Sequence, residues 1–307
     1  MEESERSAES EDAVGHITRI VGARVSVPLA VARCCQRART SHLPRVSSGE
    51  SAVGRILWSV GLALAGCCLL GALLAQGTAP VQVRVGYSRE GRPIEGYSLG
   101  NGRATAVIVG GIHGRPELNS SDLVWQLLEY FESDPSTLPP GLKLLFVPEA
   151  NPDGLADGTR ELADGVDPNR NFPTHDWLPG TFGPGKWLPD GGGDGPLSEP
   201  ETVALANLIQ RIHPVAVLSY HSAAGIAMGG ATADRTGMLA AYADNSGYPA
   251  RPFVAYPVTG DFAQWCDDIG IPTVEVELSD HFDPEFDRNL AGAEAALQEV
   301  LARYQSY

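Results

Sequence analysis

Cysteine is scarce in most of this chain. Only one of the five cysteines, Cys266, lies after residue 80. Residues 80–307 therefore cannot form an internal disulfide, and they contain no CxxC pair or Cys/His cluster of the kind that holds a structural zinc ion. We interpret Cys266, which follows Trp265, as a small buried side chain and not as a nucleophile.

Positive charge is scarce in the same region. Residues 80–307 hold 14 Lys and Arg against 31 Asp and Glu, a net charge of −17. Such an acidic domain is poorly suited to binding nucleic acid or an anionic membrane surface through its net field. We therefore predict no nucleic-acid partner, and no feature of the sequence indicates an obligate protein partner. The hydrophobic content of 43% excludes a chain that is disordered throughout.

Charge is absent from residues 56–75, a run of 20 residues that reads ILWSVGLALAGCCLLGALLA. That is about the length that an α-helix needs to cross a bilayer. Seven Arg and one acid stand between Arg19 and Arg55, so the positive-inside rule places the N-terminus in the cytoplasm. We expect a membrane-anchored or secreted protein whose residues 80–307 are extracytoplasmic.

Three kinds of export segment share that orientation over residues 53–79. They are an uncleaved signal anchor, a signal peptide cut near Ala75, and a lipoprotein signal modified at Cys67. The apolar run continues past Cys67, which argues against the lipoprotein, and we place the anchor first. Residues 1–52 are polar and aperiodic, and we interpret them as a disordered cytoplasmic tail or as the product of a start codon placed too far upstream.

Strand and helix patterns alternate after Pro80. Short apolar or alternating runs predict strands, and apolar residues at helical spacing predict helices between them. The pattern predicts an α/β domain over residues 80–307, with a mixed, mostly parallel central sheet and helices on both faces. The Gly/Pro-rich segment 173–197 is expected to be a long irregular loop. The predicted strands are 81–87, 105–112, 142–148, 214–220 and 272–278, and the predicted helices are 119–133, 198–211 and 288–304.

Polar residues follow several of these strands directly. Ligands bind at the carboxyl ends of strands in open α/β sheets, so these positions are candidates for chemistry. A His and a carboxylate a few residues apart on such a turn can both reach one cation. The segments are GGIHGRPE (110–117), NPDGLADGTR (151–160), GVDPNRNF (165–172), SYHS (219–222) and EVEL (275–278).

Taken in this order, the segments resemble the zinc carboxypeptidase family typified by pancreatic carboxypeptidase A. They are most similar to its compact bacterial branch, which includes murein peptide amidases, and the resemblance covers about residues 83–305. It implies that His113, Glu117 and His221 bind one Zn²⁺ and leave a fourth position for water. It also implies that Glu277 is the catalytic base.

The same resemblance implies the remaining roles. Arg160 would stabilise the oxyanion, and Asn169 with Arg170 would hold the terminal carboxylate of the substrate. Tyr256 matches the substrate-capping tyrosine of the family. We expect Glu275, on the strand of Glu277, to point to the opposite face.

Two positions depart from the pattern of the family. The first ligands are spaced HxxxE and not HxxE, although no other acid precedes Asp122. Pro168 stands where the family generally has Leu, and its fixed φ could shift the two residues that follow it.

The floor of the specificity pocket could be Asp261, Phe262 or Ala263. Asp261 either caps the helix that begins near Phe262 or faces the pocket and pairs with a cationic substrate group.

The function that follows from the resemblance is zinc-dependent hydrolysis of a C-terminal peptide bond, with a peptide or cell-wall peptide as the substrate. Two alternatives remain open. One is N-acyl amino acid deacylation on the same fold, and the other is a non-catalytic binding module. The presence of Glu277 and Arg160 beside a full ligand set argues against the binding module.

Overall fold

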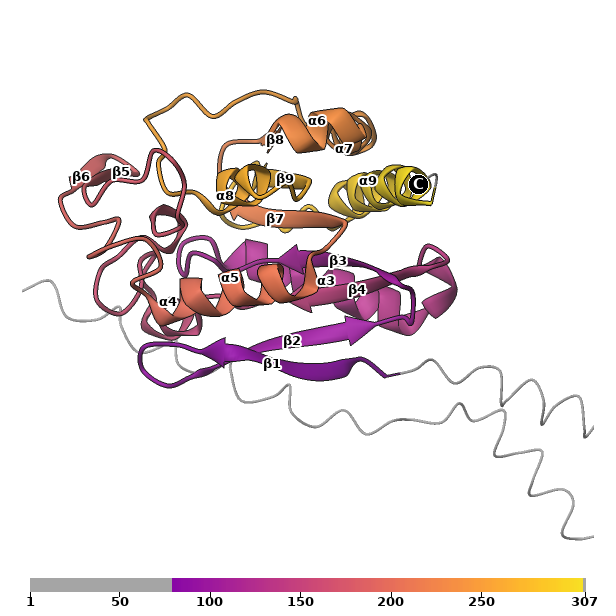
Figure 1. Ribbon diagram of the computed structural model, residues 1–307, viewed down its shortest axis with the longest axis horizontal. Coiled ribbons are helices and arrows are strands. Elements are labelled where there is room, and N and C mark those ends of the chain that lie inside the picture. The colour runs from indigo at the N-terminus through magenta and orange to yellow at the C-terminus, as the bar shows by residue number, and fades with distance from the viewer. Residues whose placement is uncertain (1–78, 306–307) are drawn as a thin grey trace, which may run out of the picture. The chain divides into compact units, whose positions relative to one another are not determined.

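The structure is a computed structural model, and it describes residues 79–305. Its main feature is a seven-stranded sheet (Figure 1). The strands of this sheet are β1 (Val81–Tyr87), β2 (Pro93–Leu99), β3 (Ala104–Val109), β4 (Leu142–Val147), β7 (Ala216–Ser222), β8 (Ile226–Gly229) and β9 (Thr273–Leu278). The longer helices are α3 (Leu118–Ser133), α5 (Pro200–Ile212), α7 (Met238–Ser246) and α9 (Phe286–Tyr304). Shorter helices are α4 (Pro152–Asp157), α6 (Ala231–Thr236) and α8 (Phe262–Asp268), with 3₁₀ turns η1 (Pro135–Thr137) and η2 (Pro168–Arg170).

The sheet is mixed, with the order β1-β2-β4-β3-β7-β9-β8. The four strands β4, β3, β7 and β9 are parallel to one another, and β1, β2 and β8 pair antiparallel at the two sides. The carboxyl ends of the parallel strands therefore meet at one edge of the sheet. This confirms the predicted α/β class and puts the polar segments that follow these strands at the same edge.

Helices cover both faces of the sheet, as predicted. The apolar side chains of β3 alternate between two clusters: Ile108 packs with α3, α7 and α9, whereas Val109 packs with α5 and α8. A strand buried on both faces must be apolar at successive positions, which explains the continuous run in β3. On α5, Leu205, Leu208 and Ile209 recur at helical spacing and form its buried face, and Figure 1 shows this helix lying across the sheet.

Several elements were not predicted. The segment 173–197, expected to be irregular, contains a short hairpin of β5 (Thr181–Gly183) and β6 (Lys186–Leu188). Its strands are too short for a periodic pattern to be visible. The strands β2 and β8 and the helices α6 and α7 also went unpredicted.

Within residues 79–305, none of the helices combines the length and the apolar character that a membrane crossing requires. The segment 56–75 and the tail 1–52 lie outside the described residues. The export segment therefore stays a prediction.

Candidate active site

Three buried side chains bring their ligand atoms together at the carboxyl edge of the sheet. His113 Nδ1 lies 3.0 Å from Glu117 Oε2 and 3.2 Å from His221 Nδ1. The third side of the triangle, from His221 Nδ1 to Glu117 Oε2, is 3.3 Å. Zinc bonds of roughly 2.0–2.2 Å place neighbouring ligand atoms of a tetrahedron roughly 3.3–3.6 Å apart. The cluster therefore fits one zinc ion with an open position, and the HxxxE spacing does not prevent Glu117 from reaching it.

The segment that carries the first two ligands is held by the loop that carries Arg160. The N–H of Gly114 donates to the Arg160 carbonyl at 3.1 Å, and the N–H of Arg115 donates to the Thr159 carbonyl at 2.8 Å. A side chain at Gly114 would place its Cβ 2.1 Å from the Thr159 oxygen, so only glycine allows this approach. Glu117 then stands directly before α3, and His221 lies on β7.

A second layer of polar groups orients the ligands. Asp167 accepts from His113 Nε2 at 2.9 Å and from the Asn169 N–H at 2.9 Å. The Ser222 N–H donates to Glu117 Oε2 at 3.2 Å, and Arg160 binds the other oxygen of that carboxylate. The sequence reasoning did not assign Asp167, although an acid two residues before Asn169 in the GVDPNRNF segment was a usable signal. Carboxylates in this position fix the tautomer of a ligating histidine.

The charge states suit a metal site. Burial, together with the nearby charge of Arg160, lowers the pKa of His113 to about 4. Burial, followed by His113 and Arg160, lowers the pKa of His221 well below its ordinary value. Both rings are therefore neutral near pH 7, and neutral imidazole is the form that binds metal. Burial alone would raise the pKa of Asp167, but His113, Arg160 and Arg170 outweigh it and hold that pKa well below 3.8.

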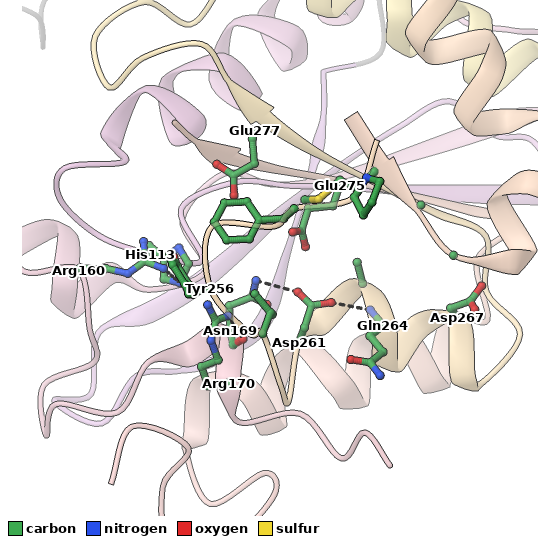
Figure 2. A pocket seen from close by; sticks show the side chains of 17 residues that line it. His113, Arg160, Asn169, Arg170, Tyr256, Asp261, Gln264, Asp267, Glu275 and Glu277 are labelled. Atoms are coloured by element: carbon green, nitrogen blue, oxygen red, sulfur yellow. Dashed lines mark hydrogen bonds between the residues drawn. The ribbon is translucent and has the colours of Figure 1, made fainter. Parts of the chain in front are cut away.

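A pocket of about 350 Å³ opens beside this cluster. Figure 2 shows Arg160, Asn169, Arg170 and Tyr256 gathered near His113. The predicted site residues that line the pocket are His113, Arg160, Asn169, Arg170, Tyr256, Asp261 and Glu277. The structure thus brings the predicted ligands, base and substrate-binding residues to one place.

The Asn169–Arg170 pair is tied to the helix behind it. Asn169 Nδ2 donates to Asp261 Oδ2 at 3.1 Å, and Asn169 Oδ1 accepts from the Phe262 N–H at 2.9 Å. Arg170 Nη1 donates to the Asn169 carbonyl at 2.6 Å, and the Tyr256 ring centre lies 6.0 Å from Arg170 Cζ. Pro168 does not disturb this arrangement, because Asn169 and Arg170 both line the pocket.

Both interpretations of Asp261 agree with its position. Asp261 Oδ1 accepts from the Gln264 N–H at 2.6 Å, which caps α8, and the same side chain lines the pocket. Phe262 is fully buried against Phe172 and Trp265, so it is not part of the pocket floor.

The expected direction of Glu275 was wrong. Glu275 and Glu277 both line the pocket, and Figure 2 shows both on the same side of β9. Side chains alternate along a strand with a period of two, so residues two positions apart share a face. Burial raises the pKa of Glu277, and His113, Arg160 and Arg170 partly offset this effect.

The sequence profile of the zinc carboxypeptidase family matches residues 78–252. The chain belongs to this family. It is accordingly a hydrolytic metallopeptidase or amidase, and the zinc that the family uses fits the cluster of His113, Glu117 and His221. The matched part ends before Tyr256, Asp261 and Glu277.

Several known proteins resemble the chain over most of its described part. It is 32% identical to murein peptide amidase A of Escherichia coli strain K12 over 185 residues, which is 57% of this chain and 72% of the relative. The crystal structure of murein-tripeptide amidase from Escherichia coli O157 covers 74% of this chain and 94% of its own, with 27% identity and a TM-score of 0.54. Bovine thrombin-activatable fibrinolysis inhibitor shares the fold with a TM-score of 0.60 at 19% identity, over 74% of this chain and 90% of its own.

Proposed function

We propose that this chain hydrolyses the amide bond before a C-terminal residue of a peptide, with zinc held by His113, Glu117 and His221 and with Glu277 as the general base. The observation that carries this proposal is the convergence of a three-ligand cluster, a carboxylate and two arginines on one pocket. Two His and one Glu with an open position form the ligand set of a catalytic zinc ion.

Glu277 performs the proton transfers in this proposal. When bound, zinc lowers the pKa of a water molecule and polarises the carbonyl that is attacked. The Glu277 carboxylate takes the proton from the attacking water, holds it, and delivers it to the nitrogen of the leaving amine. Its pKa, raised by burial, favours accepting that proton.

Arg160 is the proposed donor to the oxyanion. Its Nη atoms are occupied, since Nη1 binds Glu117 and Nη2 lies 3.4 Å from Asp167 Oδ2. Its Nε is buried and has no partner among residues 79–305. A buried donor without a partner is costly unless a ligand accepts from it, and the developing oxyanion would be such an acceptor.

Arg170 and Asn169 are proposed to hold the carboxylate at the end of the substrate. A guanidinium offers parallel donors to a carboxylate, and the hydrogen bonds of Asn169 to Asp261 and Phe262 fix the pair in place. Tyr256, beside Arg170, would close over the bound residue. This arrangement favours release of one terminal residue over cleavage within a chain.

The proposed substrates are peptides of the cell wall. The support is the similarity to the Escherichia coli relatives, which are a murein peptide amidase and a murein-tripeptide amidase. Export through residues 56–75 would bring the domain to such peptides and remains part of the proposal.

The test is hydrolysis by the purified full-length chain with zinc and with a chelator. The panel contains peptides with varied C-terminal residues and N-acyl amino acids, which a deacylase would prefer. We expect zinc-dependent release of the terminal residue from the peptides. Glu277→Gln should keep its zinc and lose about 10²–10⁴-fold in kcat on every substrate. The matched variant Glu275→Gln should stay active on a peptide with a neutral terminal residue. Exclusive hydrolysis of N-acyl amino acids, or full activity of Glu277→Gln, would reject the proposal.

A further inference from the structure

The pocket has an acidic end that the proposed reaction does not use. Three carboxyl groups besides Glu277 line its wall, from Asp261, Asp267 and Glu275. Figure 2 shows Glu275 pointing towards Asp261, away from the Arg160 and Arg170 group. The pocket is therefore basic where we propose that the terminal carboxylate binds and acidic beyond it.

Two of the three carboxylates already accept hydrogen bonds from the protein on both oxygens. Asp261 uses one oxygen to cap α8 and the other to accept from Asn169 Nδ2. Asp267 accepts from the N–H of Thr232 at 2.7 Å, from the Thr232 hydroxyl, and from the Ala231 N–H at 3.2 Å. Both have structural roles that account for their presence.

Glu275 differs from its two neighbours. It is 7% exposed, and its Oε2 has no hydrogen-bond partner among residues 79–305. His221 Nε2 lies 4.0 Å from that oxygen, which is too far for a hydrogen bond. Burial, then Asp261 and Glu277, raises the pKa of Glu275 well above its ordinary value. A buried acceptor without a donor is unfavourable, and a donor brought by the substrate would relieve it.

We infer that Glu275 selects substrates whose terminal residue carries a cationic side chain, with its free Oε2 accepting from an ammonium or guanidinium group beside Asp261. The inference rests on the proposed function, because it takes the bound residue to be anchored by Arg170 through its carboxylate. The side chain of that residue then extends past Asn169, whose hydrogen bond to Asp261 joins the two ends of the pocket. A cation at this position would also offset the repulsion that Asp261 exerts on an ionised Glu275.

The test uses two peptides that differ only in their last residue, lysine or the neutral norleucine. With the zinc-loaded full-length chain, we expect kcat/KM to favour lysine by about 10²-fold or more, because the neutral residue leaves Glu275 Oε2 buried without a donor. Glu275→Gln should reduce this ratio at least tenfold, chiefly through the lysine peptide, and should retain zinc. Asp267→Asn is the matched control, since its carboxylate is engaged by Thr232, and it should keep the ratio.

A purely structural role for Glu275 gives a different result. If Glu275 only orients His221, Glu275→Gln would lower kcat/KM equally for both peptides and would reduce the zinc content. That result would overturn the inference. A wild-type preference for norleucine would overturn it as well.

Failure of the inference can be separated from failure of the proposed function. Calorimetry with free lysine and free norleucine, the products that such a pocket would release, needs no hydrolysis. Tighter binding of lysine that is lost in Glu275→Gln supports the inference even if neither peptide is cleaved. Equal binding of the two amino acids would refute it, whatever the peptides show.

Discussion

Replacing Asp167 by Asn tests whether the second layer of the site sets its affinity for zinc. Asp167 accepts from His113 Nε2 and from the Asn169 N–H, both at 2.9 Å, and its other oxygen faces Arg160 Nη2 at 3.4 Å. Asn retains one acceptor oxygen but removes the negative charge, and its amide would face the Arg160 donor. Losing a partner of this kind typically costs 10–100-fold in metal affinity, which is about 1.4–2.8 kcal/mol. Because the substitution alters the contacts to both His113 and Arg160, we expect a loss of zinc affinity in the upper part of that range.

The measurement is zinc affinity by competition with a chelator at neutral pH. Urea unfolding of the metal-free variant reports separately on stability, because bound zinc would itself stabilise the fold. Asp164→Asn is the control, since Asp164 lies three residues earlier and pairs with Arg89 at a partly exposed position. It should change zinc affinity by less than about threefold. Unchanged affinity in a stably folded Asp167→Asn chain would refute the argument that this carboxylate orients His113.

Three further predictions follow from the site, the fold and the sequence. His221→Ala should lose its zinc and its activity, because two ligands are too few for an open site, and one zinc retained per chain would contradict the ligand set. Asp153 accepts from Ser88 Oγ at 2.6 Å, from the Glu90 N–H and from Arg92, so Asp153→Asn should lower the free energy of unfolding by about 1–3 kcal/mol. Burial alone would raise the pKa of Asp153, but these bonds lower it below 3.8. Urea unfolding at a series of pH values should therefore show the full difference in unfolding free energy between wild type and variant above pH 3.8, and this difference should disappear as the pH falls below that value. Full-length protein should fractionate with membranes and expose residues 80–307 to protease from the non-cytoplasmic side, whereas a soluble product that begins near residue 76 would select a cleaved signal.

The strands β3, β4, β7 and β9 could be predicted from the sequence because they are buried and have strong apolar patterns. A strand followed by a polar turn puts that turn at the carboxyl edge, so His113 and His221 could be placed near each other without coordinates. The distance between the ligand atoms depends on the tertiary structure and could not be predicted from local patterns. His113 and His221 are 108 positions apart, and the length of the HxxxE turn could not be judged until its backbone was seen.

The roles of the carboxylates were harder to predict. Asp261 acts both as a cap and as a pocket residue because Asn169, 92 positions away, donates to the oxygen that the cap leaves open. The local sequence pattern around Asp261 indicates only the helix cap. The error on Glu275 came from misapplying the alternation of a strand, and the correct period of two would have placed it beside Glu277. Asp167 was overlooked because its partner, His113, lies 54 positions earlier.

The hydrogen bonds of the site span most of the domain, and this has a consequence for the order in which the protein matures. Ser222 reaches Glu117 across 105 positions, and the Phe262 N–H reaches Asn169 across 93. A chain still emerging from the ribosome or crossing a membrane would hold only the local pair of His113 and Glu117, which is too few ligands to retain zinc strongly. Tight metal binding should therefore begin only once β7 has joined β3, and zinc uptake would report that the parallel centre of the sheet has formed.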